Sequence, residues 1–283
     1  AVYGIFDFIS YRTVMKIGII SSGMETLALF GFLTRYDHEY IVYYDSLHAP
    51  YGDKSFSSSL QAVEKWIQWL QAENVDTIIL PPVYELYFLQ QKQKSQILPL
   101  FQTYLLQEVF PYSLVGKLGL LWEFADLQWA QELISHLACS FSPSSVQRST
   151  KAFVFPFQFW SKECGILNPL LTRLSRKSLL TNTLLKHELR YFKDARVDTV
   201  IPLNYLYFNA EKAIAKFFNF KKIRFHRLAK LEQIFCSLTS QAKKSEYAVS
   251  IFSTDQSYFL EREKRMLWLL QRGKSIEIQR MKS

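Results

Sequence analysis

The sequence predicts an α/β protein built on parallel β-sheets, on the strength of two observations. Short apolar runs typical of buried strands alternate with stretches of about 10–18 residues in which apolar positions recur at helical spacing. This alternation is typical of parallel sheets, whose neighbouring strands are joined by helices. The chain of 283 residues is also long enough for one large domain or two of about 140 residues, and either can bury a substantial core.

The first part of the chain shows this alternation most clearly. The turn Ser21-Ser22-Gly23 follows the first strand, and the loop containing Pro50-Tyr51-Gly52 leads into a helix that opens with Ser58 and Gln61 at capping-box spacing. The predicted elements are a strand over 15–20, a helix over 24–33, a strand over 40–44, a helix over 57–73 with an inward stripe of Leu60, Val63, Ile67 and Leu70, and a strand over 77–80.

The rest of the chain repeats the pattern with longer connections. A Gln-rich helical stretch is broken at Pro99, a first domain boundary is expected near Tyr112, and a Ser/Pro-rich connection covers 140–149. The predicted elements are the helical stretch over 86–110, a strand over 114–121, a helix over 124–137, a strand over 151–157, a helix over 179–192, strands over 197–201 and 247–252, and a helix over 253–271 that opens with Ser253 and Gln256 at capping-box spacing.

Composition excludes several classes of protein. A hydrophobic share of 49% with 21% charged residues is ordinary for a globular chain and argues against disorder. The three cysteines, Cys139, Cys164 and Cys236, lack CxxC spacing, so we expect neither a zinc site nor a disulfide framework and favour a reduced, cytoplasmic setting. The histidines are scattered, so we expect no metal and no cofactor. No run reaches the roughly 18 apolar residues of a membrane span.

Positive charge is concentrated in the second half of the chain. Residues 1–160 contain 10 Lys and Arg against 14 Asp and Glu, whereas residues 161–283 contain 24 against 11. A surface of one sign attracts partners of the other, although solubility alone is an equally acceptable explanation. The run from 221 to 227 interleaves bases with aromatic residues, and it predicts a basic surface of Lys221, Lys222, Arg224 and Arg227 that docks on an acidic protein or a nucleic acid.

Two motifs resemble a known family. Ile17-Gly18-Ile19-Ile20-Ser21-Ser22-Gly23 and the loop Asp45-Ser46-Leu47-His48-Ala49-Pro50-Tyr51-Gly52-Asp53-Lys54-Ser55 are similar to the opening strand and the D-T-x-x-x-P-Y-G-x-K-S loop of the aspartate/glutamate racemase family, in particular of bacterial glutamate racemases.

The resemblance implies two parallel-sheet α/β domains with a cleft between them. It places an N-terminal extension at 1–14, a first domain at 15–112, a second at 113–208, and a return to the first domain, with the basic C-terminal part, at 209–283. A homodimer is a further expectation, since some glutamate racemases are dimers.

The resemblance also implies that the family's chemistry has been lost. The family uses two cysteines as acid and base at the substrate Cα, and the corresponding positions hold Pro81 and Asn204. Its aspartate at the end of the first strand is replaced by Ser21. Proline has no titratable group and an amide does not exchange protons at neutral pH. We therefore expect no catalytic residues of the family type.

Three functions remain open. The leading hypothesis is a non-catalytic homologue, or pseudoenzyme, with a binding or assembly role, in which Tyr84, Tyr205 and Tyr207 partly fill the old cleft. The alternatives are an isomerase of the amino-acid racemase class with an altered site, and an amino-acid or dicarboxylate sensor. A residual ligand cradle would comprise Ser22, Gly23, Pro50, Tyr51 and Gly52, although the same residues can persist only to reverse the chain.

Overall fold

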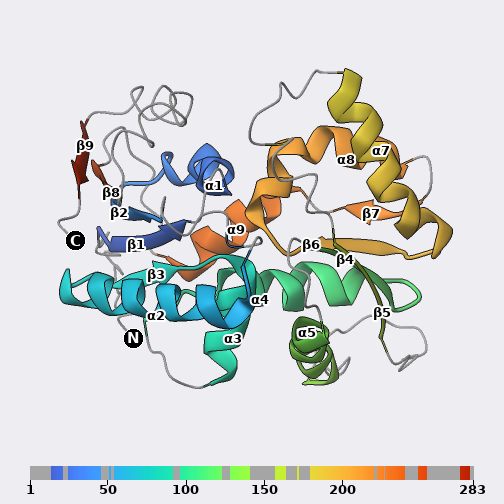
Figure 1. Ribbon diagram of the computed structural model, residues 1–283, viewed down its shortest axis with the longest axis horizontal. Coiled ribbons are helices and arrows are strands. Elements are labelled where there is room, and N and C mark those ends of the chain that lie inside the picture. Colours follow the sequence, from blue (N-terminus) through green and yellow to red (C-terminus); the bar gives the residue numbers. More distant parts are fainter. Residues whose placement is uncertain are drawn as a thin grey trace, which may run out of the picture.

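The computed structural model contains two parallel β-sheets with helices packed around them (Figure 1). It describes residues 14–21, 25–45, 51, 54–91, 96–122, 128–140, 157–163, 171, 179–219, 222–225, 227–239, 248–253 and 275–280, and the structural statements below concern these residues. The strand orders are β3-β1-β2-β8-β9 and β5-β4-β6-β7. Every pairing between these strands is parallel, which confirms the predicted class of two parallel-sheet α/β domains.

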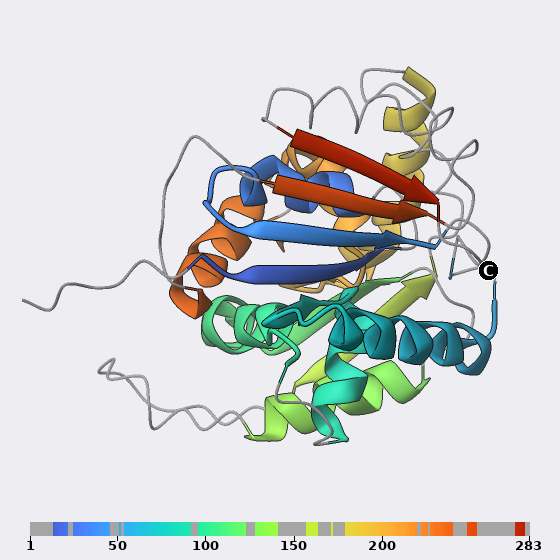
Figure 2. The same ribbon diagram turned by 90° about the vertical axis from the view of Figure 1, so that its left-hand side faces the viewer.

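The first sheet combines the two ends of the described chain. Figure 2 shows its strands β1, β2, β8 and β9 lying side by side. The apolar residues of β1, β2 and β3, together with Val249 and Ile251 of β8, are buried, as expected for a parallel sheet covered on both faces. The elements of this unit are β1 (Lys16–Ser21), α1 (Glu25–Leu33), β2 (Glu39–Tyr44), α2 (Phe56–Ala72), β3 (Thr77–Ile79), α3 (Pro82–Gln90), β8 (Ala248–Ser253) and β9 (Ser275–Arg280).

The second sheet comes from one continuous part of the sequence. Strand β7 still pairs with β6, whereas β8 and β9 have returned to the first sheet. The elements of this unit are β4 (Lys117–Trp122), α5 (Gln128–Ser140), β5 (Gln158–Glu163), α7 (Leu179–Asp194), β6 (Thr199–Pro202), the 3₁₀ segment η5 (Tyr205–Ala210), α8 (Glu211–Asn219) and β7 (Arg224–Phe225).

Short helices connect the two units. Helix α4 (Leu100–Tyr104) continues into a π-helical turn over Leu105–Val109 and a 3₁₀ turn over Phe110–Tyr112 before β4 begins. Helix α9 (Leu228–Leu238) lies between the sheets in Figure 1, and it packs against both α4 and α1. Segment η5 of the second unit also packs against α1. The two sheets are therefore held together by side chains from both units.

Helix α2 confirms one sequence prediction and corrects another. Val63, Ile67 and Leu70 of its apolar stripe are buried, and Leu60 is half-buried. The N-cap is Ser55, however, whose Oγ accepts a hydrogen bond from the backbone N–H of Ser58 at 3.3 Å. The predicted Ser58 capping box is therefore wrong, because the serine three residues earlier already satisfies that N–H.

Two other boundaries differ from the sequence prediction, one expected helix lies outside the described residues, and one strand was not predicted. Helix α3 begins at Pro82 instead of 86, because proline fits the first helical turn. The second unit's edge strand is β5 at Gln158–Glu163, whereas the strand was expected over 151–157, most of which lies outside the described residues. The helix expected over 253–271 also lies almost wholly outside them. Strand β9 was not predicted, since its SIEIQR sequence contains only isolated apolar residues.

Gly119 in β4 allows helix α7 to approach the second sheet closely. A Cβ at this position would lie 2.6 Å from Phe192 Cδ1 and 3.2 Å from Val200 Cγ2. We expect Gly119→Ala to lower the free energy of unfolding by about 1–3 kcal/mol through overpacking. Equilibrium denaturation by urea measures this change, and Phe192→Leu in the same chain should recover part of the loss.

Gly31 in α1 provides the matched control. The nearest atom to a Cβ there is Leu228 Cδ2 at 3.8 Å, which is an ordinary contact. Gly31→Ala should therefore leave stability unchanged or raise it by about 0.5–1 kcal/mol, since alanine favours a helix interior. Equal losses in the two variants would show that close packing at Gly119 is not the cause.

Candidate functional site

The carboxyl ends of β1, β2 and β3 carry the residues that the family resemblance singles out. Ser21 is fully buried at the end of β1, and its Oγ accepts a hydrogen bond from the hydroxyl of Thr26 on α1. Glu25 at the start of α1 is 4% exposed. The end of β1 thus offers a neutral hydroxyl pair where the resemblance implies an aspartate.

Asp45 ties the loop after β2 to helix α2. Its Oδ2 accepts a hydrogen bond from the Tyr51 hydroxyl at 3.0 Å and another from Trp66 Nε1 at 3.3 Å. Burial, and then the charge of Asp45, raise the pKa of Tyr51 well above its ordinary value, so this hydroxyl stays protonated. Of the predicted cradle, Tyr51 is described and buried, whereas Ser22, Gly23, Pro50 and Gly52 lie outside the described residues.

Glu85 on α3 is a second buried carboxyl group with a structural task. Its two oxygens accept hydrogen bonds from the backbone N–H groups of Phe101 at 2.9 Å and Gln102 at 2.7 Å, in the first turn of α4. Burial raises the pKa of Glu85 to about 8, although both N–H groups act in the opposite direction. Glu85 therefore holds α3 and the start of α4 together.

Pro81 and Asn204 occupy the two positions where the resemblance expects cysteines. Pro81 precedes α3 as its N-cap residue, with an extended backbone. Asn204 is 2% exposed, and its Oδ1 accepts a hydrogen bond from the N–H of Leu206 at 2.7 Å, which starts η5. Both residues therefore begin helical segments.

The three tyrosines predicted to fill the space between the units are buried. Tyr84 and Tyr205 are each 1% exposed, and Tyr207 is 0% exposed. Tyr84 stacks on Phe56 with ring centroids 5.5 Å apart, and the Tyr207 hydroxyl donates to the carbonyl of Trp122 at 3.2 Å.

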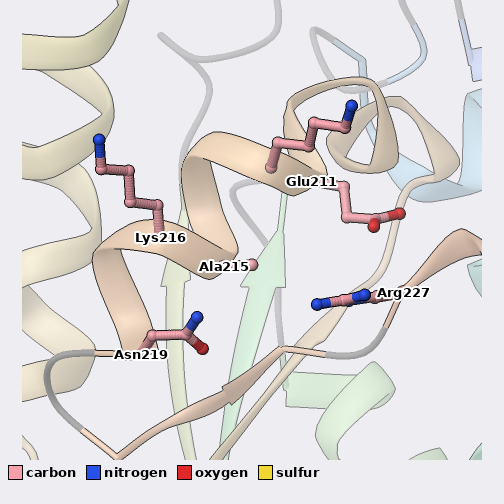
Figure 3. Close-up of a pocket in the computed structure, with 6 residues that line it drawn as sticks. Glu211, Ala215, Lys216, Asn219 and Arg227 are labelled. Carbon is pink, nitrogen blue, oxygen red and sulfur yellow. The ribbon is translucent and has the colours of Figure 1, made fainter.

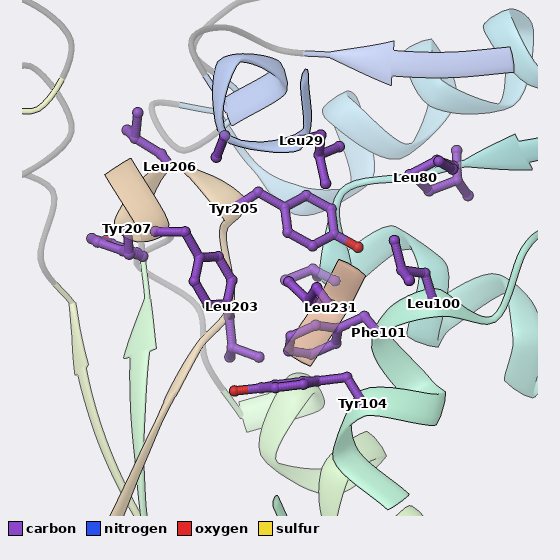
Figure 4. Close-up of a cluster of buried hydrophobic side chains, with 14 of the residues drawn as sticks. Leu29, Leu80, Leu100, Phe101, Tyr104, Leu203, Tyr205, Leu206, Tyr207 and Leu231 are labelled. Carbon is purple, nitrogen blue, oxygen red and sulfur yellow. The ribbon is translucent and has the colours of Figure 1, made fainter. Parts of the chain in front are cut away.

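Tyr205 extends from η5 into a cluster built by both units. Figure 4 shows its ring between Leu29 and Leu80 on one side and Leu100 and Phe101 on the other. The Phe101 ring meets it edge-on at 6.3 Å. Burial, and then the charges of Glu85 and Glu25, raise the pKa of Tyr205 well above its ordinary value. Within the described residues its hydroxyl has no hydrogen-bond partner.

Asp45 and Glu85, two buried acids of this interior, accept hydrogen bonds from the protein itself. A general acid or base must come within hydrogen-bond reach of the substrate atom that gains or loses the proton. Asp45 and Glu85 are already engaged by protein donors, and the Tyr205 ring is enclosed by side chains. Across the described residues, no three His, Cys, Asp or Glu side chains are grouped so that they could hold a metal ion.

The predicted basic surface is divided in the structure. Lys222 and Arg227 are exposed, and Lys221 lies outside the described residues. Arg224 is half-buried, because its Nη1 donates to the carbonyl of Tyr112 at 2.6 Å and its guanidinium lies 5.3 Å from the centre of that ring.

Arg227 faces helix α8 instead, where it lines a surface pocket of about 460 Å³. The sequence reading missed Lys212 and Lys216 in this pocket, although their spacing of four residues places them on one face of a helix.

None of the helices in the described part of the chain is both long enough and apolar enough to cross a lipid bilayer.

Comparison with known proteins points to one family. No family model matches the chain. A glutamate racemase of Leptospira interrogans (serogroup Icterohaemorrhagiae, serovar copenhageni) is 44% identical over 68 residues, which cover 23% of this chain and 27% of the relative. A glutamate racemase of Leptospira borgpetersenii is 41% identical over 68 residues, or 23% and 26% of the two chains. The match thus spans about a quarter of these curated relatives.

Solved structures extend the likeness to nearly the whole chain. A glutamate racemase isoform from Bacillus anthracis superposes with a TM-score of 0.73 at 15% identity, covering 96% of this chain and 98% of that one. The enzyme from Francisella tularensis, solved with D-glutamate, gives 0.71 at 15% identity and covers 95% and 97%. The protein therefore has the fold of glutamate racemases over nearly its whole length and is similar to them in sequence over one segment of 68 residues.

Proposed function

We propose that this protein is a non-catalytic racemase homologue whose scaffold serves binding or assembly. One observation carries the proposal: Pro81 and Asn204 stand where the family resemblance expects two cysteines, and Tyr84, Tyr205 and Tyr207, which follow them in the sequence, are buried. Moving a proton at Cα requires a titratable group on each face of the substrate, and each such group contributes a factor of about 10²–10⁴.

Cys236, a thiol whose contacts the structure describes, does not offer a replacement for the missing cysteines. Cys236 is described as a free cysteine on α9, and its Sγ donates to the Tyr36 hydroxyl at 2.7 Å. Tyr36 lies just before β2 begins, whereas Ser21 lies at the end of β1, which runs parallel to β2. Cys236 therefore lies near the amino-terminal ends of the strands, whereas Ser21 and Pro81 lie at their carboxyl ends.

Deuterium exchange tests the loss of catalysis. We expect D- or L-glutamate and aspartate, incubated with the purified chain in D₂O, to keep their Cα protons at the rate seen in buffer alone. Proton NMR follows the Cα signal, and an active glutamate racemase serves as the positive control. Exchange at an enzymatic rate would contradict the proposal and favour the alternative of an isomerase with altered catalytic residues, in which case Asp45→Asn and Tyr205→Phe would identify the residues used.

The alternative of a dicarboxylate sensor fits the space between the two units less well than the non-catalytic homologue does. Glu25, Asp45 and Glu85 are all buried there, and an ionised dicarboxylate would be repelled by any of them that is charged. Thermal-shift titration with amino and dicarboxylic acids provides the measurement, since a ligand at 100 times its Kd stabilises a protein by about 2.7 kcal/mol. A shift of that size would favour the sensor.

The assembly role rests on surfaces outside this interior. Two residues of the predicted basic surface, Lys222 and Arg227, are exposed, which supports the docking of this surface on an acidic partner. A homodimer remains a second form of assembly within the same proposal. Sedimentation of the pure chain measures the homodimer directly.

A further inference from the structure

The pocket between α8 and the start of α9 is separate from the filled interior. It has a volume of about 460 Å³ and is lined by Glu211, Lys212, Ala215, Lys216, Asn219 and Arg227. In Figure 3 the Arg227 guanidinium points across the hollow toward α8, with Glu211 above it and Asn219 on the opposite side of the hollow. Lys212 and Lys216 line the pocket from α8 and are exposed, and in Figure 3 the Lys216 side chain extends away from Arg227.

The cations of this pocket lack the ion pairs that some other cations in the described part of the chain form. Lys162, Lys230 and Arg35 each lie within 3.2 Å of a glutamate oxygen. Within the described residues, by contrast, Lys212, Lys216 and Arg227 form no ion pair. Three cationic groups with one carboxylate therefore give the hollow an excess of positive charge that the described protein does not neutralise.

The single carboxylate of the pocket is already engaged. Glu211 Oε2 accepts a hydrogen bond of 2.7 Å from the backbone N–H of Leu228, which is the first residue of the 11-residue helix α9. Arg227, the N-cap residue of α9, supplies no side-chain cap. A helix N-terminus favours negative charge, and here the chain's own glutamate occupies part of it. Glu211 thus already supplies a negative charge to the N-terminus of α9, and the cations of the pocket lie beside it.

We propose that this pocket binds a small phosphorylated metabolite of about nucleotide size. An arginine fork with flanking lysines matches the several oxygens and double charge of a phosphomonoester better than a single carboxylate. The volume falls within the range of small-molecule sites, about 300–1,000 Å³. A nucleic acid would need a longer row of cations, and the neighbouring Arg224 is already bound to Tyr112. The inference goes beyond the proposed function and does not depend on it.

Isothermal titration of the full chain with adenosine monophosphate tests this inference at low salt. Arg227→Glu and Lys216→Glu should each raise the Kd at least about tenfold, since each removes a charge-assisted contact. Arg190→Glu provides the matched control, because Arg190 is exposed on α7, does not line the pocket, and undergoes the same change of charge. Circular dichroism of each variant confirms folding, which replacement of exposed side chains should preserve.

Two further ligands, inorganic phosphate and single-stranded DNA, show which kind of phosphate compound the pocket binds. Inorganic phosphate should bind at the same place, more weakly, and compete with adenosine monophosphate. Absence of binding by both probes, or equal Kd values for the Arg227→Glu and Arg190→Glu chains, would overturn the inference. Binding of a 12-nucleotide single-stranded DNA without binding of adenosine monophosphate would also overturn it, in favour of a nucleic-acid surface.

Discussion

Replacing Tyr205 with alanine is expected to lower the free energy of unfolding by about 3–5 kcal/mol, as for other large aromatic residues in a core. Tyr205 is 1% exposed, and its ring lies between the two units against Leu29, Leu80 and Phe101. Removing the ring leaves a cavity at the contact that holds the units together. Equilibrium unfolding in urea, followed by tryptophan fluorescence, measures the loss.

Tyr205→Phe separates packing from the hydroxyl group. This hydroxyl is buried without a hydrogen-bond partner among the described residues, so its removal should be neutral or stabilising by up to about 1 kcal/mol. If alanine were tolerated as well as phenylalanine, the space between the units would not be packed as the structure describes, and an open ligand cleft would become the better reading.

Glu85→Ala is expected to lower the free energy of unfolding by about 2–4 kcal/mol. The change leaves the N–H groups of Phe101 and Gln102 without their acceptor and also creates a cavity. The start of α4 should then lose protection in amide hydrogen exchange. Equal protection of these two amides in the variant and the parent chain would show that Glu85 does not fix α4.

The titration of Glu85 makes a separate prediction about pH. Burial raises its folded-state pKa from the ordinary 4.5 to about 8. Between those values the folded chain keeps a proton that the unfolded chain releases, so this group's contribution to stability falls as pH rises from about 5 to about 8. Glu85→Gln removes the titration. The stability of the parent relative to this variant should fall by at most about 1.4 kcal/mol per pH unit over that range, and a difference that stays constant would rule out a raised pKa.

Local sequence patterns predicted most of the secondary structure and failed where partners are distant. The strand of the first sheet expected over 40–44 and the helix expected over 179–192 closely match β2 and α7, because each has its apolar periodicity within one segment. Strand β9 was not predicted because its formation depends on pairing with β8, in which Ile276 lies opposite Val249. The cap of α2 was misplaced because Ser55 and Ser58 have equal propensity, and only the geometry distinguishes them.

The hydrogen bonds of the candidate site could not be predicted from the sequence. The family resemblance assigns Pro81 and Asn204 to the cysteine positions, and this assignment stays a prediction, whereas Tyr84, Tyr205 and Tyr207, which were expected to fill the space between the units, are buried. It did not reveal that Glu85 caps α4, since its acceptor role depends on how α3 and α4 meet. The pocket at α8 was missed for the same reason. Lys216 lies on α8 and Arg227 lies just before α9, and the connection that contains β7 places both beside one pocket.

The sheet order has a consequence for synthesis of the chain on the ribosome. Strands β4 to β7 of the second sheet are synthesised one after another. In the first sheet, by contrast, β2 lacks its neighbour until β8 has been synthesised and Tyr40 can pair with Val249. Until then the growing polypeptide exposes the unpaired edge of an apolar strand, which is a template for aggregation. The C-terminal strands thus complete a sheet begun some 200 residues earlier, and a nascent chain arrested before residue 248 needs chaperone protection although its second unit has already been translated.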